Sequence, residues 1–143
     1  MHLGALLSRH ARYRPQHLAL VFERHRLTFE ALNRRVNRLA NALLAAGLAK
    51  GDKVATVLPN CLEQIEVYCA VAKCGLVAVP LSPLLQEAGL VTLLGNSDAK
   101  LVISTAVFTA TLDRARAQVP GVRADRWLLI EGARPGYRGL NEL

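Results

Sequence analysis

The amino-acid sequence predicts an α/β protein with alternating βαβ units, a mostly parallel sheet and helices on both of its faces. Short apolar runs alternate with helical patterns at intervals of about 25 residues, which is typical of βαβ units. The apolar runs are continuous rather than alternating, as expected for strands buried on both faces of a sheet. With 143 residues, 52% of them hydrophobic, the chain has the size and composition of one domain. We therefore expect a single α/β domain over residues 1–143.

The first fifty residues predict two helices with a hairpin between them. The N-terminal stretch MHLGALLSRHARYRP is interpreted as an amphipathic helix, with a transit peptide as the alternative. The run LALVFE (18–23) predicts a strand, and RHRL after it predicts the return of a hairpin. A helix should follow, with Thr28 as its N-cap and Gly47 as its left-handed stop. Its apolar face combines six residues at helical spacing: Leu32, Val36, Leu39, Ala40, Leu43 and Leu44.

The rest of the chain predicts three further strand–helix pairs and one closing strand. VATVLP (54–59) should be a buried strand, and Asn60 should cap the next helix, with Glu63 in capping-box spacing. That helix should end at Gly75. The remaining elements are expected as strand 76–80, stopped by Pro80 and Pro83, helix 84–94, strand 101–104, helix 105–119 and strand 126–131, followed by a loop-like tail.

The stretch GLAKGDK (47–53) resembles a phosphate-binding loop but fails its requirements. Such a loop needs G-x-x-x-x-G-K-[ST] between a strand and a helix. Here Gly47 and Gly51 are one residue too close, Asp52 stands where the lysine belongs, and a helix precedes a strand. We interpret the stretch as a helix-to-strand turn.

Catalytic patterns are missing from the sequence. There is no dinucleotide fingerprint, no nucleophile elbow and no metal-ligand spacing. Glu63 and Glu66 could pair two carboxylates on one helix face, but an acidic first turn is the simpler interpretation. The ends of the strands carry three weak polar rims: Pro59-Asn60, Pro80-Leu81-Ser82 and Ser104-Thr105. We assign no catalytic, cofactor-binding or metal-binding residue.

The cysteines and the charge distribution indicate the cellular compartment and the classes of partner that the chain could bind. Three cysteines with spacings of eight and five match no zinc pattern, and an odd number argues against a disulfide framework, so we expect a reducing, cytoplasmic compartment. The net charge of +7 is concentrated in residues 1–50, which hold nine Arg and Lys against two Glu. Such a region could meet nucleic acid or an anionic membrane. Because no aromatic residues interleave with the arginines, we expect a solvated helix face and no nucleic-acid partner. No apolar run approaches the roughly 18 residues of a membrane span.

The ordered motifs of the chain resemble the N-terminal region of the adenylate-forming (AMP-binding) acyl-CoA synthetases, of the fatty-acid CoA ligase type. The order and approximate spacing are kept by Gly47, Gly51-Asp52, Val54-Ala55, Leu58-Pro59-Asn60, Lys73, Gly75, Pro80, Pro83 and Ser97-Asp98-Ala99-Lys100. Three positions depart from the pattern. Glu30 stands one place early for a capping box, Gly89 interrupts a helix, and Leu-Ser rather than Leu-Asp follows Pro80. The last departure favours a fatty or aryl acid ligase over an amino-acid-activating domain.

The resemblance implies a reaction in two halves. A carboxylic acid and ATP give an acyl-adenylate and pyrophosphate, and coenzyme A then displaces AMP; Mg²⁺ is implied as the metal. The family's phosphate loop, T-S-G-T-T-G-x-P-K-G, does not occur in these 143 residues. We therefore expect an N-terminal fragment of a larger AMP-binding domain that is inactive and binds no cofactor alone. An exposed face should lead to self-association, with a homodimer as one form. The alternative is a stand-alone, non-catalytic α/β binding or regulatory module.

Overall fold

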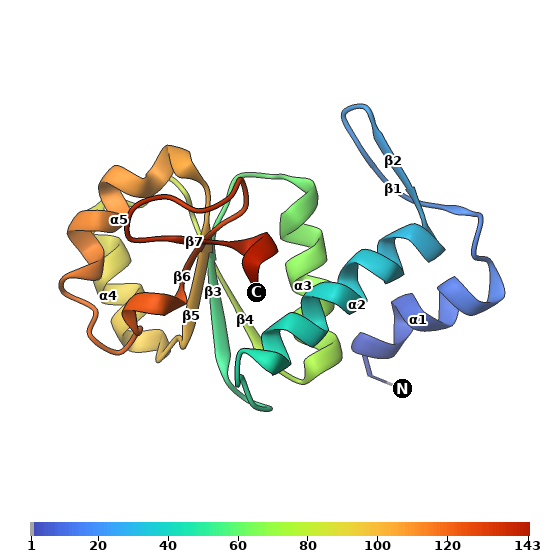
Figure 1. Ribbon diagram of the computed structural model, residues 1–143, viewed down its shortest axis with the longest axis horizontal. Helices are drawn as coiled ribbons and strands as arrows, with labels where there is room; N and C mark the ends of the chain where they lie inside the picture. The colour runs from blue at the N-terminus through green and yellow to red at the C-terminus, as the bar shows by residue number, and fades with distance from the viewer. Residues whose placement is uncertain (1) are drawn as a thin grey trace. The chain divides into compact units, whose positions relative to one another are not determined.

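A computed structural model describes residues 2–143, which fall into two compact units (Figure 1). The helical unit contains the residues up to Lys50 and Cys61–Leu76. The sheet unit contains Gly51–Asn60 and Val77–Leu143. The single domain expected from the sequence stays a prediction.

Five parallel strands form the sheet unit. In spatial order they are β4 (Val77–Leu81), β3 (Lys53–Val57), β5 (Leu101–Ser104), β6 (Trp127–Leu129) and β7 (Arg138–Gly139). The predicted α/β class with a mostly parallel sheet flanked by helices is thereby confirmed.

The inner strands of the sheet are buried on both faces. Residues on one face, such as Ala55 and Trp127, join the main hydrophobic cluster. Residues on the other face, Val54, Leu101 and Ile103, are equally inaccessible at 0% exposure. This two-sided burial explains why the strands read as continuous apolar runs in the sequence.

Helices α4 (Glu87–Ser97) and α5 (Thr109–Arg116) supply the rest of that cluster, chiefly through Leu90, Leu94 and Leu112. The start of α4 lies three residues beyond the predicted position, and the predicted helix 105–119 is split into the 3₁₀ turn η1 (Ala106–Phe108) and α5.

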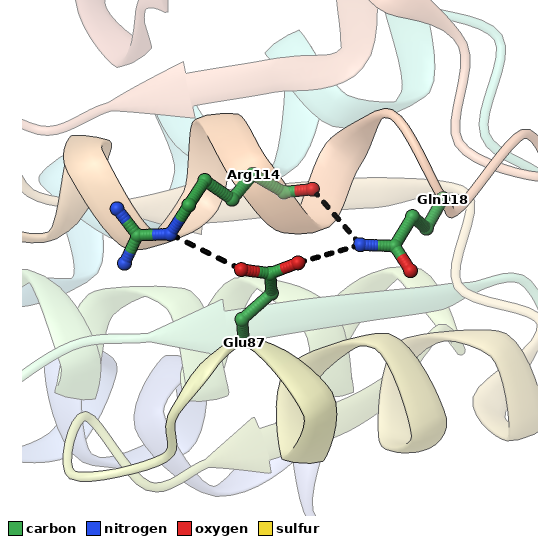
Figure 2. A network of polar contacts seen from close by, with 3 residues as sticks. All are labelled: Glu87, Arg114 and Gln118. Atoms are coloured by element: carbon green, nitrogen blue, oxygen red, sulfur yellow. Dashed lines mark hydrogen bonds and ion pairs between the residues drawn. The ribbon is translucent and has the colours of Figure 1, made fainter.

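A surface network joins these two helices (Figure 2). The carboxylate of Glu87 accepts from Arg114 Nε at 3.1 Å and from Gln118 Nε2 at 2.7 Å. Because Arg114 and Glu87 remain 57% and 38% exposed, the ion pair adds only a few tenths of a kcal/mol, and buried apolar contacts hold the helices together.

The tail after β6, expected to be a loop, adds strand β7 and a short turn η3 (Leu140–Glu142). The guanidinium of Arg116 fixes it, lying 5.3 Å from the ring centroid of Trp127 and 5.1 Å from that of Tyr137. The Tyr137 hydroxyl donates to Asp113 Oδ1 at 2.7 Å. Cation–π contacts of this kind join residues far apart in the sequence, so the local pattern of the tail could not predict its strand.

The helical unit consists of α1 (Gly4–Tyr13), α2 (Phe29–Ala45), α3 (Leu62–Cys74) and an antiparallel hairpin of β1 (Leu18–Phe22) and β2 (His25–Thr28). All were predicted to within a few residues. In Figure 1, α1 and α2 run through the blue and cyan part of the chain, and the hairpin stands between them in sequence.

The predicted ends of α2 and α3 are confirmed at three positions. Thr28 caps α2 by accepting from Ala31 N at 3.2 Å, Gly47 has φ +84° beyond its end, and Gly75 ends α3 with φ +68°. One residue of the expected apolar face is wrong, because Leu44 is 48% exposed. Its neighbour Leu43 is fully buried, so the buried face in the last turn of the helix passes through Leu43 and leaves Leu44 at its margin.

Polar bonds tie α2 to α3. Lys73 Nζ donates to Asn33 Oδ1 and, at 2.6 Å, to Asn37 Oδ1, one helical turn further on. Arg35 donates to the carboxylate of Glu66, whose side chain is only 9% exposed. This hydrogen bond raises the pKa of Arg35, and burial lowers that of Lys73. Lys73, a motif residue without an evident role in the sequence, therefore cross-links two helices.

Two further expectations around the strands are wrong. Asn60 does not cap α3, because the N-cap is Cys61, which makes no side-chain capping bond. Pro80 does not stop its strand but lies within β4. Since β4 is an edge strand, one side of its backbone needs no ladder partner, and a proline is tolerated there.

Gly4 lets α1 approach the backbone of α3. A Cβ added at Gly4 would lie 2.4 Å from Ala72 O and 2.8 Å from Lys73 Cα. Both contacts are with backbone, which cannot move aside as a flexible side chain could.

We expect Gly4→Ala to lower the free energy of unfolding by about 1–3 kcal/mol, because α1 must shift away from α3. The matched control is Gly95→Ala in α4, where an added Cβ meets nothing within 4 Å. That change should stabilise the chain by up to about 1 kcal/mol through helix propensity. Urea unfolding monitored by circular dichroism measures both. Equal effects of the two changes would contradict the close approach.

Burial and the bond to Asp113 raise the pKa of Tyr137 well above its usual value near 10. The folded state therefore keeps this proton where the unfolded state loses it, so the stabilisation is complete below about pH 10 and is lost as the pH rises further. We expect Tyr137→Phe to cost about 1–2 kcal/mol at pH 7, through the lost hydrogen bond.

The difference in unfolding free energy between wild type and Tyr137→Phe should shrink between pH 10 and pH 11. Urea titrations at pH 7, 10 and 11 give this difference directly, because all other groups are common to both proteins. A difference that stays constant over this range would mean that Tyr137 ionises as readily in the folded state.

Candidate functional site

The carboxyl edge of the sheet is the best candidate for a binding region. Strands β3 to β6 are parallel, so their carboxyl ends meet at one edge. The chain leaves β3 for β4 on one side, whereas β5 and β6 lie on the other side of β3. Open α/β sheets bind ligands beyond such a switch point, here between the ends of β3 and β5.

Ser104 occupies the switch point itself. It is 1% exposed, and its Oγ donates to Val57 O, the last residue of β3, at 2.8 Å. The hydroxyl therefore joins the ends of two strands. It is neither exposed to a ligand nor close to a base that could activate it.

The turn after β5 is held by two side chains. Thr105 Oγ1 accepts from Val107 N at 3.2 Å, and the carboxylate of Glu131, just beyond β6, accepts from Ala106 N at 3.1 and 3.2 Å. The role of Glu131 was not predicted, because this residue was expected to lie within the last strand, 126–131, whereas β6 ends at Leu129. Its position directly after a parallel strand was the available signal.

The arrangement does not fit a nucleotide phosphate. The amide donors that could meet an anion at the start of η1, those of Ala106 and Val107, are already bound by Glu131 and Thr105. The carboxylate of Glu131 would also repel a phosphate at this point. The described residues therefore offer no site here for ATP or its Mg²⁺.

The remaining predicted rims lie at the same edge and are open to solvent. Ser82 Oγ accepts from Leu84 N at 3.2 Å, and Pro59 and Asn60 are exposed. Two large apolar side chains are conspicuous there: Leu84 is 85% exposed and Val107 is 79% exposed. This edge is thus fitted for contact with other protein or an apolar group rather than for proton transfer.

Among residues 2–143, the sheet unit contains no histidine that could act as a general acid or base. All four histidines, His2, His10, His17 and His25, precede the sheet unit in the sequence. Glu66, considered as half of a carboxylate pair with Glu63, instead forms the ion pair with Arg35. The chemical role open to this edge is to bind another protein segment or an apolar group and to hold it in position.

The three cysteines are free thiols in the structure. Burial raises the pKa of Cys61, Cys69 and Cys74, so each favours the neutral form and is a poor nucleophile. Within residues 2–143, no group of three or more His, Cys, Asp or Glu side chains could hold a metal ion. In the same part of the chain, every helix is too short or too polar to cross a bilayer.

We expect Ser104→Ala to lower the unfolding free energy by about 1–2 kcal/mol, because it removes a buried hydrogen bond between β5 and β3. The control, Ser82→Ala, removes an exposed turn bond at the same edge and should cost less than about 0.5 kcal/mol. Thermal unfolding of the two variants gives the comparison. A loss at Ser82 as large as that at Ser104 would argue against a special role of the switch-point hydroxyl.

Sequence comparison finds relatives among CoA ligases. The chain is 38% identical over 105 residues to the long-chain-fatty-acid–CoA ligase FadD13 of Mycobacterium tuberculosis, covering 72% of this chain and 21% of the relative. It is 38% identical over 103 residues to the medium-chain fatty-acid–CoA ligase of Escherichia coli K12, covering 71% and 18%. The chain thus spans about a fifth of the length of these relatives.

Solved structures agree with the sequence relatives. The N-terminal domain of FACL13 from Mycobacterium tuberculosis superposes with a TM-score of 0.87 at 31% identity, covering 99% of this chain and 34% of that one. A fatty acyl CoA synthetase from the same organism gives 0.84 at 34% identity, covering 91% and 26%.

The family model described as AMP-binding enzyme matches residues 7–135, nearly the whole chain. The match includes every strand and helix of the sheet unit up to β6, but not β7 or the turn η3, and it includes most of the helical unit. This chain is therefore a member of the AMP-binding enzyme family and corresponds to the N-terminal region of its acyl-CoA synthetases.

Proposed function

We propose that this chain provides the N-terminal scaffold of an ATP-dependent acyl-CoA synthetase. The observation that carries the proposal is the match of the AMP-binding family over residues 7–135, together with 38% identity to a fatty-acid–CoA ligase over 105 residues. In the proposed reaction, a carboxylic acid and ATP form an acyl-adenylate and pyrophosphate, and coenzyme A then takes the acyl group and releases AMP. ATP, Mg²⁺ and coenzyme A act with the complete enzyme, in the cytoplasm.

The role of these residues in that enzyme is structural. The sheet fixes the positions of the turns at its carboxyl edge, through bonds such as Ser104 Oγ to Val57 O. The exposed side chains of Leu84 and Val107 at this edge would be covered by further protein in the complete enzyme. In the isolated chain, the same apolar surface would favour self-association.

We propose a fatty or aryl acid as the substrate class. The support is twofold: the named activities of the relatives, which include long-chain and medium-chain fatty-acid ligases, and Ser82 in place of an aspartate after Pro80-Leu81. An amino acid substrate would call for a carboxylate to meet its ammonium group.

A chimaera tests the proposal. In it, residues 1–143 replace the equivalent N-terminal region of the FadD13 ligase, and fatty-acid-dependent ATP–pyrophosphate exchange and acyl-CoA formation are measured. We expect measurable turnover in the chimaera and none in the 143-residue chain alone, since the latter contains no family phosphate loop.

A second chimaera carrying Gly4→Ala serves as the control for fold. It should lose thermal stability while keeping activity below its melting temperature, because Gly4 acts only in helix packing. A folded chimaera without turnover would contradict the scaffold role and favour a non-catalytic binding module. Pyrophosphate exchange by the 143 residues alone would overturn the proposed inactivity.

A further inference from the structure

One side of α1 forms a continuous stripe whose character changes along its length. Leu3, Leu6, His10 and Tyr13 follow one another at spacings of three and four residues, so they line the same side of the helix. Eleven residue steps from Leu3 to Arg14 correspond to about 16 Å at 1.5 Å per residue. The first half of the stripe is apolar, and the second half is aromatic and basic.

An apolar hollow of about 280 Å³ lies along the first half, within the helical unit. Leu3, Leu6 and Leu7 of the α1 region form one wall. Tyr68, Cys69 and Ala72, which are neighbours on one side of α3, form the opposite wall. Gly4 and Ala72 also line the hollow, and the two helices lie close beside it because Gly4 has no Cβ to meet the backbone of α3.

A second hollow, of about 290 Å³, continues along the same side of α1. Its lining combines Arg9, Tyr13 and Arg14 with Leu6 and His10, and the last two also line the apolar hollow. The His10 ring marks the junction and is held in place by stacking on Phe29, with ring centroids 4.9 Å apart. Because they share Leu6 and His10, the two hollows adjoin, and we refer to them together as the groove, with an apolar end and a basic end.

The charge around the basic end is one-sided. No acidic residue precedes Glu23 in the sequence, whereas Arg9, Arg12 and Arg14 all belong to α1 and its C-cap. The acidic residue whose backbone reaches this region is Glu30, through its amide bond to Pro15 O. Its carboxylate is already engaged by Gln16 at 3.0 Å and Arg34 at 3.7 Å.

We propose that this groove binds a single-chain anionic amphiphile, with the hydrocarbon tail between α1 and α3 and the anionic head at Arg14. The apolar hollow matches the lower end of known ligand-pocket volumes, about 300–1,000 Å³, which suits one tail rather than two. Burial of the tail supplies the affinity, and Arg14 selects the sign of the head. The ligand class is a fatty carboxylate or an alkyl phosphate bound at a site outside the sheet unit.

Isothermal titration calorimetry on the 143-residue chain tests the proposal, without ATP or coenzyme A, so that its outcome does not depend on ligase activity. The probes are laurate and dodecyl phosphate, each below its critical micelle concentration, in 150 mM salt to screen distant charges. Dodecyl maltoside and dodecyltrimethylammonium carry the same tail with a neutral or a cationic head. We expect at least tenfold tighter binding of an anionic probe than of either control, and the tighter of the two anions identifies the head group.

Two exposed arginines on the same helix provide a matched pair of variants. Arg14→Glu should weaken binding of the anionic probes at least fivefold, because it reverses a charge that lines the groove. Arg12→Glu makes the same change of charge at an exposed position that does not line either hollow, and should change the affinity less than twofold. Cys69→Leu should narrow the apolar hollow and weaken binding of the anionic probes while far-UV circular dichroism stays unchanged.

Three results would overturn the proposal. Equal binding of the neutral and anionic probes would reduce the groove to a non-selective apolar surface. Equal losses in Arg12→Glu and Arg14→Glu would show a diffuse charge effect. Binding to phosphatidylglycerol vesicles, without binding of the monomeric probes, would make this face a membrane-docking surface instead.

Discussion

The pairing of β3 with two neighbours is the constraint on which the sheet unit depends. β3 bonds to β4 on one side and to β5 on the other, and β6 and β7 are added outward from β5. Four of its five residues are at most 1% exposed, so a charged side chain at any of these positions would be buried without a partner. Removing this one strand would leave β4 without a ladder and expose the backbone edge of β5 that now pairs with β3. The pairing of the whole sheet therefore depends on the short segment Gly51–Asn60, which contains β3.

Local signals in the sequence were sufficient for most of the fold. Continuous apolar runs gave the parallel strands, and Thr28 and Gly75 marked helix ends, because their effects act within a few residues. The predictions were wrong where residues far apart in the sequence determine the local structure. β7 pairs with β6 next to Tyr137, which Arg116 contacts from α5, and Pro80 is tolerated because β4 is at an edge. Neither the stacking partner nor the place of a strand in the sheet can be read from neighbouring residues.

The candidate sites show the same contrast between features that neighbouring residues determine and features that distant residues determine. The polar rims at Ser82 and Ser104-Thr105 followed from the rule that parallel strands share a carboxyl edge, and they do lie there. Their roles in fixing turns, and the part played by Glu131, needed the three-dimensional arrangement. The groove on α1 could not be predicted from the sequence, for a further reason. One wall of its apolar hollow comes from α3, some sixty residues away in the sequence, and the close approach at Gly4 brings the two helices together.

The distribution of aromatic and imidazole groups separates the two units spectroscopically. Trp127, the only tryptophan, is 1% exposed against Arg116 in the sheet unit, so its fluorescence reports on that unit alone. All four histidines belong to the helical unit, where their ring protons give resolved NMR signals. Trp127 fluorescence and the histidine NMR signals thus follow the unfolding of each unit without any label. A difference between the two unfolding midpoints would measure how cooperatively the units unfold.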